Sequence, residues 1–411
     1  MAPVALFLLH AAAVIGLPYI LWSIGGRRWM PLVVVQILVG LLLGPTVLGT
    51  LAPEFWSVLF PPRVLDSWNG LVWLGITYFA FATGLHFDVT EFQGRGRAFA
   101  ITSTATFAVP TAAGCVAGGL LLWLVPGVAG EGTSPWAFAL GVGIAVGVTA
   151  LPVLAAILRE MNLQTPWIGN EALGCAAVND AALWIAIAIL LAISAGEHWW
   201  QAGLVLCGSL AYGAALWFVV RPMLAAYLVR AGSPVEITER HVVFLSVGVS
   251  LSALITENLG LHALVGGFAF GAIIPKAVAR QVLDRVEAFL MAVLLPFFFM
   301  STGLKTNFVW ASGAGLVFAL TTIASLSSKM LAAALPARLQ GQSWNRALAL
   351  GALVSCKGLM ELVVLTMLLE RGILSPSAFS GMVLMALLTT ALARPLAEFF
   401  LGRDAQESPR G

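Results

Sequence analysis

Long apolar stretches separated by short polar loops dominate the sequence. A helix needs about 20 apolar residues to cross about 30 Å of hydrocarbon, and most of these stretches are that long. Hydrophobic residues make up 60% of the 411 residues and charged residues 10%. That balance leaves too little polar surface to cover a water-soluble protein of this size, so a soluble enzyme is excluded. The predicted fold class is an all-α polytopic membrane protein.

The sequence predicts thirteen transmembrane helices. The first apolar stretch is expected to be a retained span and not a signal peptide, because no basic residue precedes it and it is too long for a signal core. Residues 402–411 are expected to form a short cytoplasmic tail, and no attached soluble domain is expected. The predicted spans cover residues 3–24, 30–49, 68–86, 97–125, 136–159, 167–195, 199–229, 240–257, 262–275, 283–303, 309–336, 345–370 and 377–401.

The distribution of basic residues predicts the orientation of these spans. Most of the 21 Lys and Arg residues fall in alternate loops on one side, whereas only Arg63, Lys305 and Arg371 fall in loops on the other side. Cytoplasmic loops are rich in Lys and Arg, so the N-terminus is predicted outside and the C-terminus in the cytoplasm. The 19 acidic residues nearly balance the basic ones, so no nucleic-acid partner is expected.

Thirteen spans divide as six, one and six, which places the second six in inverted orientation relative to the first, as in many transporters. The fifth and twelfth predicted spans correspond at this offset, and both contain residues that weaken a helix. Gly147 and Pro152 lie in the fifth span, and Gly358 lies in the twelfth. Pro152 removes a backbone donor, so carbonyl groups from Gly147 to Thr149 are candidate cation ligands. A simple proline kink is an equally good interpretation of this feature.

Four ionisable residues fall deep inside predicted spans, where a charge costs about 2.5–3.5 kcal/mol on insertion scales. Asp180 lies halfway along the sixth span, Lys329 lies on the eleventh, and Lys357 and Glu361 lie on the twelfth. Pairing or ligand binding must recover most of that cost. We therefore expect Asp180 to face the protein interior and to take part in transport.

Three roles remain open for Lys357 and Glu361. They are four residues apart, so they can neutralise each other on one helix face. They can take part directly in ion coordination. They can also offset the partial charges at the exposed ends of a broken helix. For Lys329, a partner inside the bundle is expected, because the inner end of its span is near the limit of a lysine's reach.

Several segments, in this order, resemble a known family. They are Gly147-Val148-Thr149-Ala150-Leu151-Pro152, Ala176-Ala177-Val178-Asn179-Asp180, Ser301-Thr302-Gly303-Leu304-Lys305-Thr306-Asn307 and Lys357-Gly358-Leu359-Met360-Glu361-Leu362. They are similar to the signature segments of the monovalent cation:proton antiporter-2 family, with the strongest resemblance to plant-type cation/proton exchangers and bacterial Na⁺(K⁺)/H⁺ antiporters. The resemblance covers nearly the whole chain from the second span onward.

The resemblance implies the sodium/proton antiporter fold, in which a scaffold holds a mobile core with two crossing broken helices. Residues 1–401 would form the transporter domain, with the scaffold at about 1–90 and 236–305 and the core at about 95–195 and 309–401. It also implies a homodimer in the inner (plasma) membrane of a bacterium. Plant and Kef-type relatives carry a long cytosolic domain. Only a short tail is predicted after the last span of this chain, so no nucleotide-binding domain and no cofactor are expected.

The resemblance also assigns roles to individual residues. Asp180 would bind the monovalent cation and the proton in turn, with Asn179 and Thr149 beside it. Asn179 stands where electrogenic members have a second aspartate. Lys329 would face the carboxylate, and Lys357 with Glu361 would compensate charge at the second broken helix, next to Gly358. His86 stands where many members have Glu.

These residues predict antiport by alternating access, with one proton exchanged for one monovalent cation, either Na⁺ or K⁺. Since Asn179 cannot titrate, the exchange is expected to be electroneutral; electrogenic exchange with Lys329 as a second proton carrier is the alternative. A sodium-coupled symporter of an organic anion on the same fold is the other alternative, although few polar side chains beyond Thr149, Asn179 and Ser355 are expected at the crossing. A channel and an intramembrane enzyme are disfavoured, because one carboxylate at a single crossing makes no pore and no HExxH motif is present.

Overall fold

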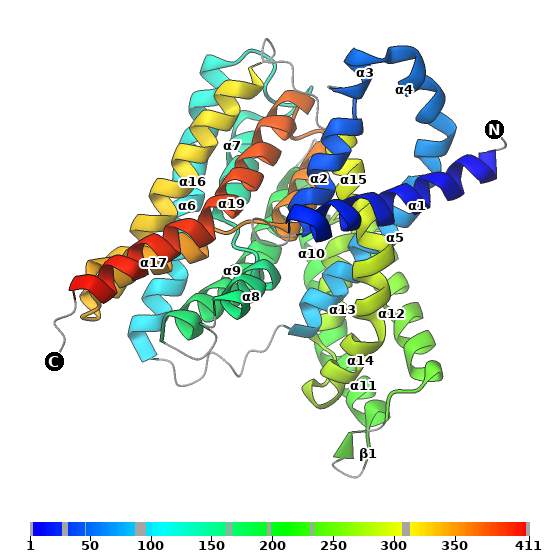
Figure 1. Ribbon diagram of the computed structural model, residues 1–411. Helices are drawn as coiled ribbons and strands as arrows, with labels where there is room; N and C mark the ends of the chain where they lie inside the picture. Colours follow the sequence, from blue (N-terminus) through cyan, green and yellow to red (C-terminus); the bar gives the residue numbers. More distant parts are fainter. Residues whose placement is uncertain are drawn as a thin grey trace.

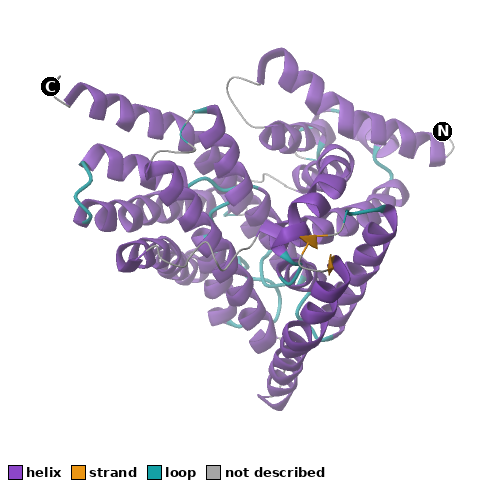
Figure 2. Cartoon of the chain, turned by 90° about the horizontal axis from the view of Figure 1, so that it is seen from below, coloured by secondary structure: helices purple, strands orange, loops and turns teal. Residues whose placement is uncertain are grey.

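The computed structural model describes residues 3–26, 32–45, 47–86, 96–161, 163, 167–194, 199–230, 233–234, 236–305 and 313–407. Over these residues the regular structure is almost entirely helical (Figure 1, Figure 2). The exception is a small hairpin of β1 (Val229–Arg230) and β2 (Ser233–Pro234), which pair antiparallel with Val229 opposite Pro234. The prediction of an all-α membrane protein is confirmed.

The helices before the hairpin are α1 (Pro3–Leu21), α2 (Leu32–Leu43), α3 (Leu48–Leu51), α4 (Pro53–Leu59), α5 (Pro62–His86), α6 (Gly96–Leu124), α7 (Pro135–Gly147), α8 (Leu151–Glu160), α9 (Trp167–Ser194), α10 (Trp199–Ala215) and α11 (Arg221–Leu228). The helices after it are α12 (Glu239–Asn258), α13 (Ala263–Ala272), α14 (Lys276–Phe289), α15 (Leu295–Lys305), α16 (Ala314–Leu339), α17 (Trp344–Val354), α18 (Leu359–Glu370) and α19 (Pro376–Glu407).

Short π-helical segments extend or join some of these helices. The segment η1 (Trp22–Gly26) continues α1, η3 (Leu216–Val220) joins α10 to α11, and η4 (Leu290–Leu294) joins α14 to α15. The residues from 276 to 305 therefore form one continuous helix, which begins seven residues before the predicted span 283–303. The early part of this helix carries charged residues such as Arg280 and Asp284, so its apolar pattern is weak and the sequence did not reveal its start.

Helices lie on all thirteen predicted ranges, but they differ in kind. Among the described residues, eight helices are long and apolar enough to cross a membrane by length and composition. The range 262–275 holds only the ten residues of α13, and the ranges 136–159 and 345–370 each hold two short helices with a break between them. The count of thirteen spans stays a prediction.

The helices gather in two groups that stand side by side in Figure 1. In one group α6 packs against α7, α9 and α16, and α17 packs against α16 and α19. In the other, α5 packs against α13 and α15, α2 packs against α15, and α12 packs against α13. The core and scaffold boundaries predicted from the sequence stay a prediction.

Glycine allows close contact between straight helices in the second group. A Cβ atom on Gly84 of α5 would collide with the backbone of α13 at Phe268 and Ala272. A Cβ atom on Gly303 of α15 would collide in the same way with α2 at Ile37 and Leu41. Small residues at such positions let membrane helices pack backbone to backbone.

Candidate functional site: the crossing of two broken helices

Two breaks in the first group of helices meet in the middle of that group. The first separates α7, which ends at Gly147, from α8, which begins at Leu151. The second separates α17, which ends at Val354, from α18, which begins at Leu359. The Ala150 amide donates to the Cys356 carbonyl oxygen at 3.2 Å, and the Thr149 hydroxyl donates to the Val354 carbonyl oxygen at 2.8 Å. The crossing of two broken helices, predicted from the sequence, is confirmed.

The position of Pro152 shows that the first break is not a proline kink in a continuous helix. Pro152 is the second residue of α8, where a helix leaves its backbone N–H groups unpaired in any case. A proline there fits the start of a new helix and does not kink a continuous one, so the simple-kink interpretation is wrong. The unwound residues 148–150 precede Pro152.

Gly147 and Gly358 lie at the two breaks. At both positions a side chain would collide with a neighbouring residue. A Cβ atom on Gly147 would collide with the Thr111 hydroxyl, and one on Gly358 would come within 2.6 Å of Val153 Cγ2. Gly358 has a φ of 178°, an extended conformation that any residue adopts. The requirement at both positions is therefore close packing of the crossing against its neighbours.

Lys357 lies in the second break, and its ammonium group caps the end of the first half-helix. Its Nζ donates to the carbonyl oxygens of Ala145 at 2.8 Å and Val146 at 2.9 Å, in the last turn of α7. It also lies 3.3 Å from Glu361 Oε2, and both side chains are completely buried. Glu361 is in the first turn of α18. The structure thus combines two of the three open roles: the residues pair with each other and also lie at helix ends of opposite partial charge.

Lys329 on α16 lies on the same crossing. Its Nζ donates to three oxygen atoms, namely the carbonyls of Thr106 at 2.9 Å and Gly147 at 2.6 Å and the Thr149 hydroxyl at 2.5 Å. The side chain is completely buried. The resemblance placed Lys329 opposite Asp180, but in the described part of the chain these two residues form no ion pair within 4.0 Å. Of the carbonyl groups from Gly147 to Thr149 that the sequence suggested as cation ligands, Lys329 contacts that of Gly147.

Asp180 is a buried carboxylate with one unpartnered oxygen atom. It lies halfway along α9, it is 4% exposed, and its Oδ1 atom is buried and makes no hydrogen bond. Removing a carboxylate from water without a donor or a cation is strongly unfavourable. Burial therefore favours a form of Asp180 that is neutralised by a proton or a cation.

Asn179 precedes Asp180 and connects α9 to the first break. Its side-chain amide lies 3.0 Å from the Thr149 hydroxyl oxygen. With the amide turned so that its nitrogen faces α6 and α9, it donates to the carbonyl oxygens of Ser103 and Cys175, each at 3.2 Å. The amide is completely buried, and its contacts with α6 and the first break hold α9 against the crossing.

Three hydroxyl residues at the crossing were not predicted from the sequence. Ser103 and Thr106 on α6 lie beside Asn179 and Lys329, and Thr390 on α19 contacts the second break. The signal available in the sequence was their occurrence inside otherwise apolar helices. Ser103 and Thr106 donate to carbonyl oxygens of their own helix, so they add few free polar groups for an organic anion.

The described crossing defines a class of protein. A helical membrane bundle with two discontinuous helices that meet around buried charges is the architecture of a secondary transporter. The chain belongs to the sodium/hydrogen exchanger family, since the family model for the transmembrane region of sodium/hydrogen exchangers matches residues 9–399. This is a family of transporters and not of enzymes.

Known relatives agree with this assignment. The chain is 30% identical to the Na⁺/H⁺ antiporter NhaS4 of Synechocystis, with 95% of this chain and 96% of that protein covered. It is 34% identical to cation/H⁺ antiporter 17 of Arabidopsis thaliana, with 89% of this chain and 45% of the relative covered. For the K⁺/H⁺ antiporter 1 of Saccharomyces cerevisiae the identity is 28%, and the coverage is 97% and 46%. The chain thus spans about half the length of the plant and yeast relatives.

A solved structure shows the same fold. The sodium proton antiporter MjNhaP1 of Methanocaldococcus jannaschii superposes with a TM-score of 0.65, at 12% sequence identity, over 98% of this chain and 99% of that one. The predicted sodium/proton antiporter fold is confirmed by this match.

Proposed function

We propose that this protein exchanges a monovalent cation, Na⁺ or K⁺, for protons across a membrane by alternating access. The observation that carries the proposal is the buried Asp180 carboxylate, which has an unpartnered oxygen and lies next in sequence to the Asn179 that contacts the crossing. Such a carboxylate holds a proton or a cation, but holding both is unfavourable. If the core moves only when Asp180 is neutralised, exchange is obligatory and leak is suppressed.

Lys329 supports an electroneutral exchange of one proton for one cation. An ammonium group has three N–H donors, and Lys329 faces three acceptors, whereas a neutral amine has only two N–H donors. The geometry therefore fits a charged Lys329 that keeps its proton in this conformation. Asn179 cannot titrate, so Asp180 is the one proton carrier of the proposed mechanism.

We also propose that the protein forms a homodimer in the inner membrane of a bacterium, with the N-terminus outside. The dimer and the membrane follow from the resemblance to the antiporter family. The orientation follows from the excess of Lys and Arg in alternate loops.

Purified protein in liposomes tests the proposed function. A pH gradient is imposed, Na⁺, K⁺, Li⁺, Rb⁺ and choline are added in turn, and the lumenal pH is read. We expect Na⁺ or K⁺ to move the lumenal pH and choline to leave it unchanged. A sodium-coupled symporter would leave the pH unchanged with every cation, which would contradict the proposal.

The stoichiometry is tested in the same liposomes. A membrane potential is imposed with valinomycin and K⁺, and Na⁺ is used as the transported cation. One-for-one exchange predicts the same rate and end-point with and without the potential. A rate or end-point that follows the potential would contradict one-for-one exchange and favour the alternative in which Lys329 is a second proton carrier.

A further inference from the structure

The backbone groups at the second break have different hydrogen-bond partners. The Val354 and Cys356 carbonyl groups accept from Thr149 and Ala150 of the first break, and the Gly358 carbonyl accepts from the Leu362 amide at 3.2 Å. In the described structure the peptide groups of Lys357 have no such backbone partner. The Lys357 amide donates instead to the Thr390 hydroxyl oxygen at 3.1 Å, and the Lys357 carbonyl oxygen accepts from the same hydroxyl.

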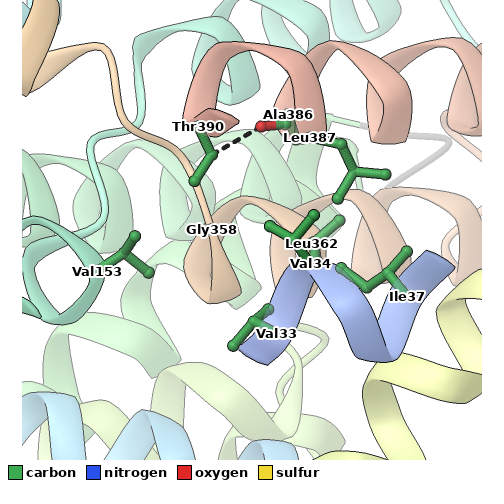
Figure 3. Close-up of a pocket in the computed structure, with 9 residues that line it drawn as sticks. All are labelled: Val33, Val34, Ile37, Val153, Gly358, Leu362, Ala386, Leu387 and Thr390. Carbon is green, nitrogen blue, oxygen red and sulfur yellow. Dashed lines mark hydrogen bonds between the residues drawn. The ribbon is translucent and has the colours of Figure 1, made fainter. Parts of the chain in front are cut away.

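Thr390 is well placed for this contact. It is 5% exposed, it lies on α19, and Figure 3 shows it next to Gly358 of the break. Its hydroxyl proton faces two acceptors, the Lys357 carbonyl and the Ala386 carbonyl of its own helix at 2.7 Å. A buried threonine inside a helix usually bonds only the carbonyl four residues before it. Thr390 therefore ties a continuous helix to an unwound segment.

The orientation of the Lys357 peptide determines where the Lys357 side chain goes. The ammonium group reaches Ala145 and Val146 on α7 and Glu361 on α18, all from an unwound residue. A residue in a regular helix has its side-chain direction fixed by the helix, and a residue in a break does not. Another contact must fix this direction, and among the described residues only Thr390 hydrogen-bonds to both the amide and the carbonyl group of Lys357.

We infer that Thr390 is a positioning residue for transport: its hydroxyl holds the Lys357 peptide so that the Lys357 ammonium group caps the end of α7 beside the cation site. The inference rests on the proposed exchange function. Thr390 does not contact the cation, and it acts through Lys357.

Thr389 provides a matched control. It is the neighbouring residue on α19, and it is completely buried. Its hydroxyl donates only to carbonyl oxygens of its own helix, Met385 at 2.8 Å and Ala386 at 3.2 Å. Replacing either threonine by valine removes one buried hydroxyl and keeps the shape, but only Thr390→Val leaves the Lys357 peptide groups without partners.

The experiment compares Thr390→Val, Thr390→Ser, Thr390→Ala and Thr389→Val with the unchanged protein in liposomes. Initial rates of cation-dependent proton flux are measured over a range of cation concentrations, and the melting temperature of each purified variant is recorded. We expect Thr390→Val and Thr390→Ala to lose at least about tenfold in Vmax/KM per folded molecule, because the amide and the carbonyl group of Lys357 both lose their partner. Thr390→Ser keeps the hydroxyl and should retain at least about half of the activity, as should Thr389→Val.

Two outcomes would overturn the inference. One is Thr390→Val with a rate close to that of Thr389→Val at a similar loss of melting temperature, which would make the hydroxyl merely structural. The other is Thr390→Ser as inactive as Thr390→Ala, which would show that the hydroxyl does not matter; this pair also decides the question if Thr390→Val does not fold. If the unchanged protein shows no cation-dependent proton flux, the proposed function fails and Thr390 has no transport role to perform.

Discussion

The crossing of the broken helices and the contact between α5 and α13 solve the same problem in opposite ways. Both bring two backbones close together inside a membrane, where every backbone polar group needs a partner. At α5 and α13 the helices stay intact, and Gly84 provides the space. At the crossing the helices are interrupted, and Lys357, Lys329 and Thr149 satisfy the exposed backbone groups.

The difference between intact and interrupted helices shows which region can bind ions. Intact helices with glycine contacts keep their backbone groups paired within each helix, so they offer few backbone groups to an ion. A break leaves carbonyl and amide groups that side chains or ions can satisfy. Substitutions at the crossing should therefore change transport more than stability, and substitutions at the glycine contact should do the reverse.

The largest effect is expected for Asp180→Asn. The amide keeps the shape of the carboxylate, but it can neither release a proton nor attract a cation. We expect cation-dependent proton flux in liposomes to fall to a few per cent or less of the original rate, with a melting temperature that changes by only a few degrees. Asp66→Asn, at an exposed carboxylate on α5, is the control and should transport normally. Flux that survives in Asp180→Asn would remove this residue from the mechanism.

A smaller loss is expected for Lys329→Gln. Glutamine has no charge and two N–H donors for the three oxygen atoms that Lys329 contacts, so at least one of them loses its donor. The rate of exchange should fall about tenfold, because one buried unpaired group costs about 1–3 kcal/mol. Lys305→Gln, at an exposed lysine on α15, is the control. Equal rates in the two variants would mean that Lys329 is not needed for transport.

Gly84→Ala should affect stability and leave the transport rate of the folded molecules nearly unchanged. The new Cβ atom collides with the backbone of α13, and overpacking of this kind costs about 1–3 kcal/mol. Gly70→Ala on the same helix meets no atom within 4 Å and should be neutral or slightly stabilising. Thermal unfolding of both variants in detergent checks the difference. If the Gly84→Ala protein were as stable as Gly70→Ala, α5 and α13 would be able to move apart without a loss of stability.

The smallest effect is expected for Arg371→Gln. Arg371 follows α18 in one helix group, and its guanidinium lies 2.8 Å from Glu257 of α12 in the other. Both side chains are partly exposed, so the pair contributes about 0–1 kcal/mol and salt should weaken it. We expect a melting temperature within a few degrees of the original at low salt and no difference at high salt. A large loss of transport would instead show that this pair couples the two groups during the cycle.

Much of the crossing could be predicted from the sequence, for reasons that are local. The cost of placing Asp180, Lys329, Lys357 and Glu361 in lipid depends on the residue type alone, so the sequence shows that they are buried and need partners. Pro152 indicates the start of a new helix because its effect on the backbone is local, whereas the need for glycine at positions 147 and 358 comes from packing against neighbouring helices. The transport roles of these residues stay predictions until the variants above are measured.

The sequence by itself determined the helical membrane fold, the two breaks and the buried charges of this protein. Tertiary structure alone decided which atoms those charges contact, and it placed Lys329 on Thr106, Gly147 and Thr149 without an ion pair to Asp180. It also placed Thr390 on the peptide of Lys357. The physical reason is that the acceptors are mostly backbone carbonyl groups, which every residue carries. Only the packing of helices distant in sequence selects which carbonyl a side chain reaches.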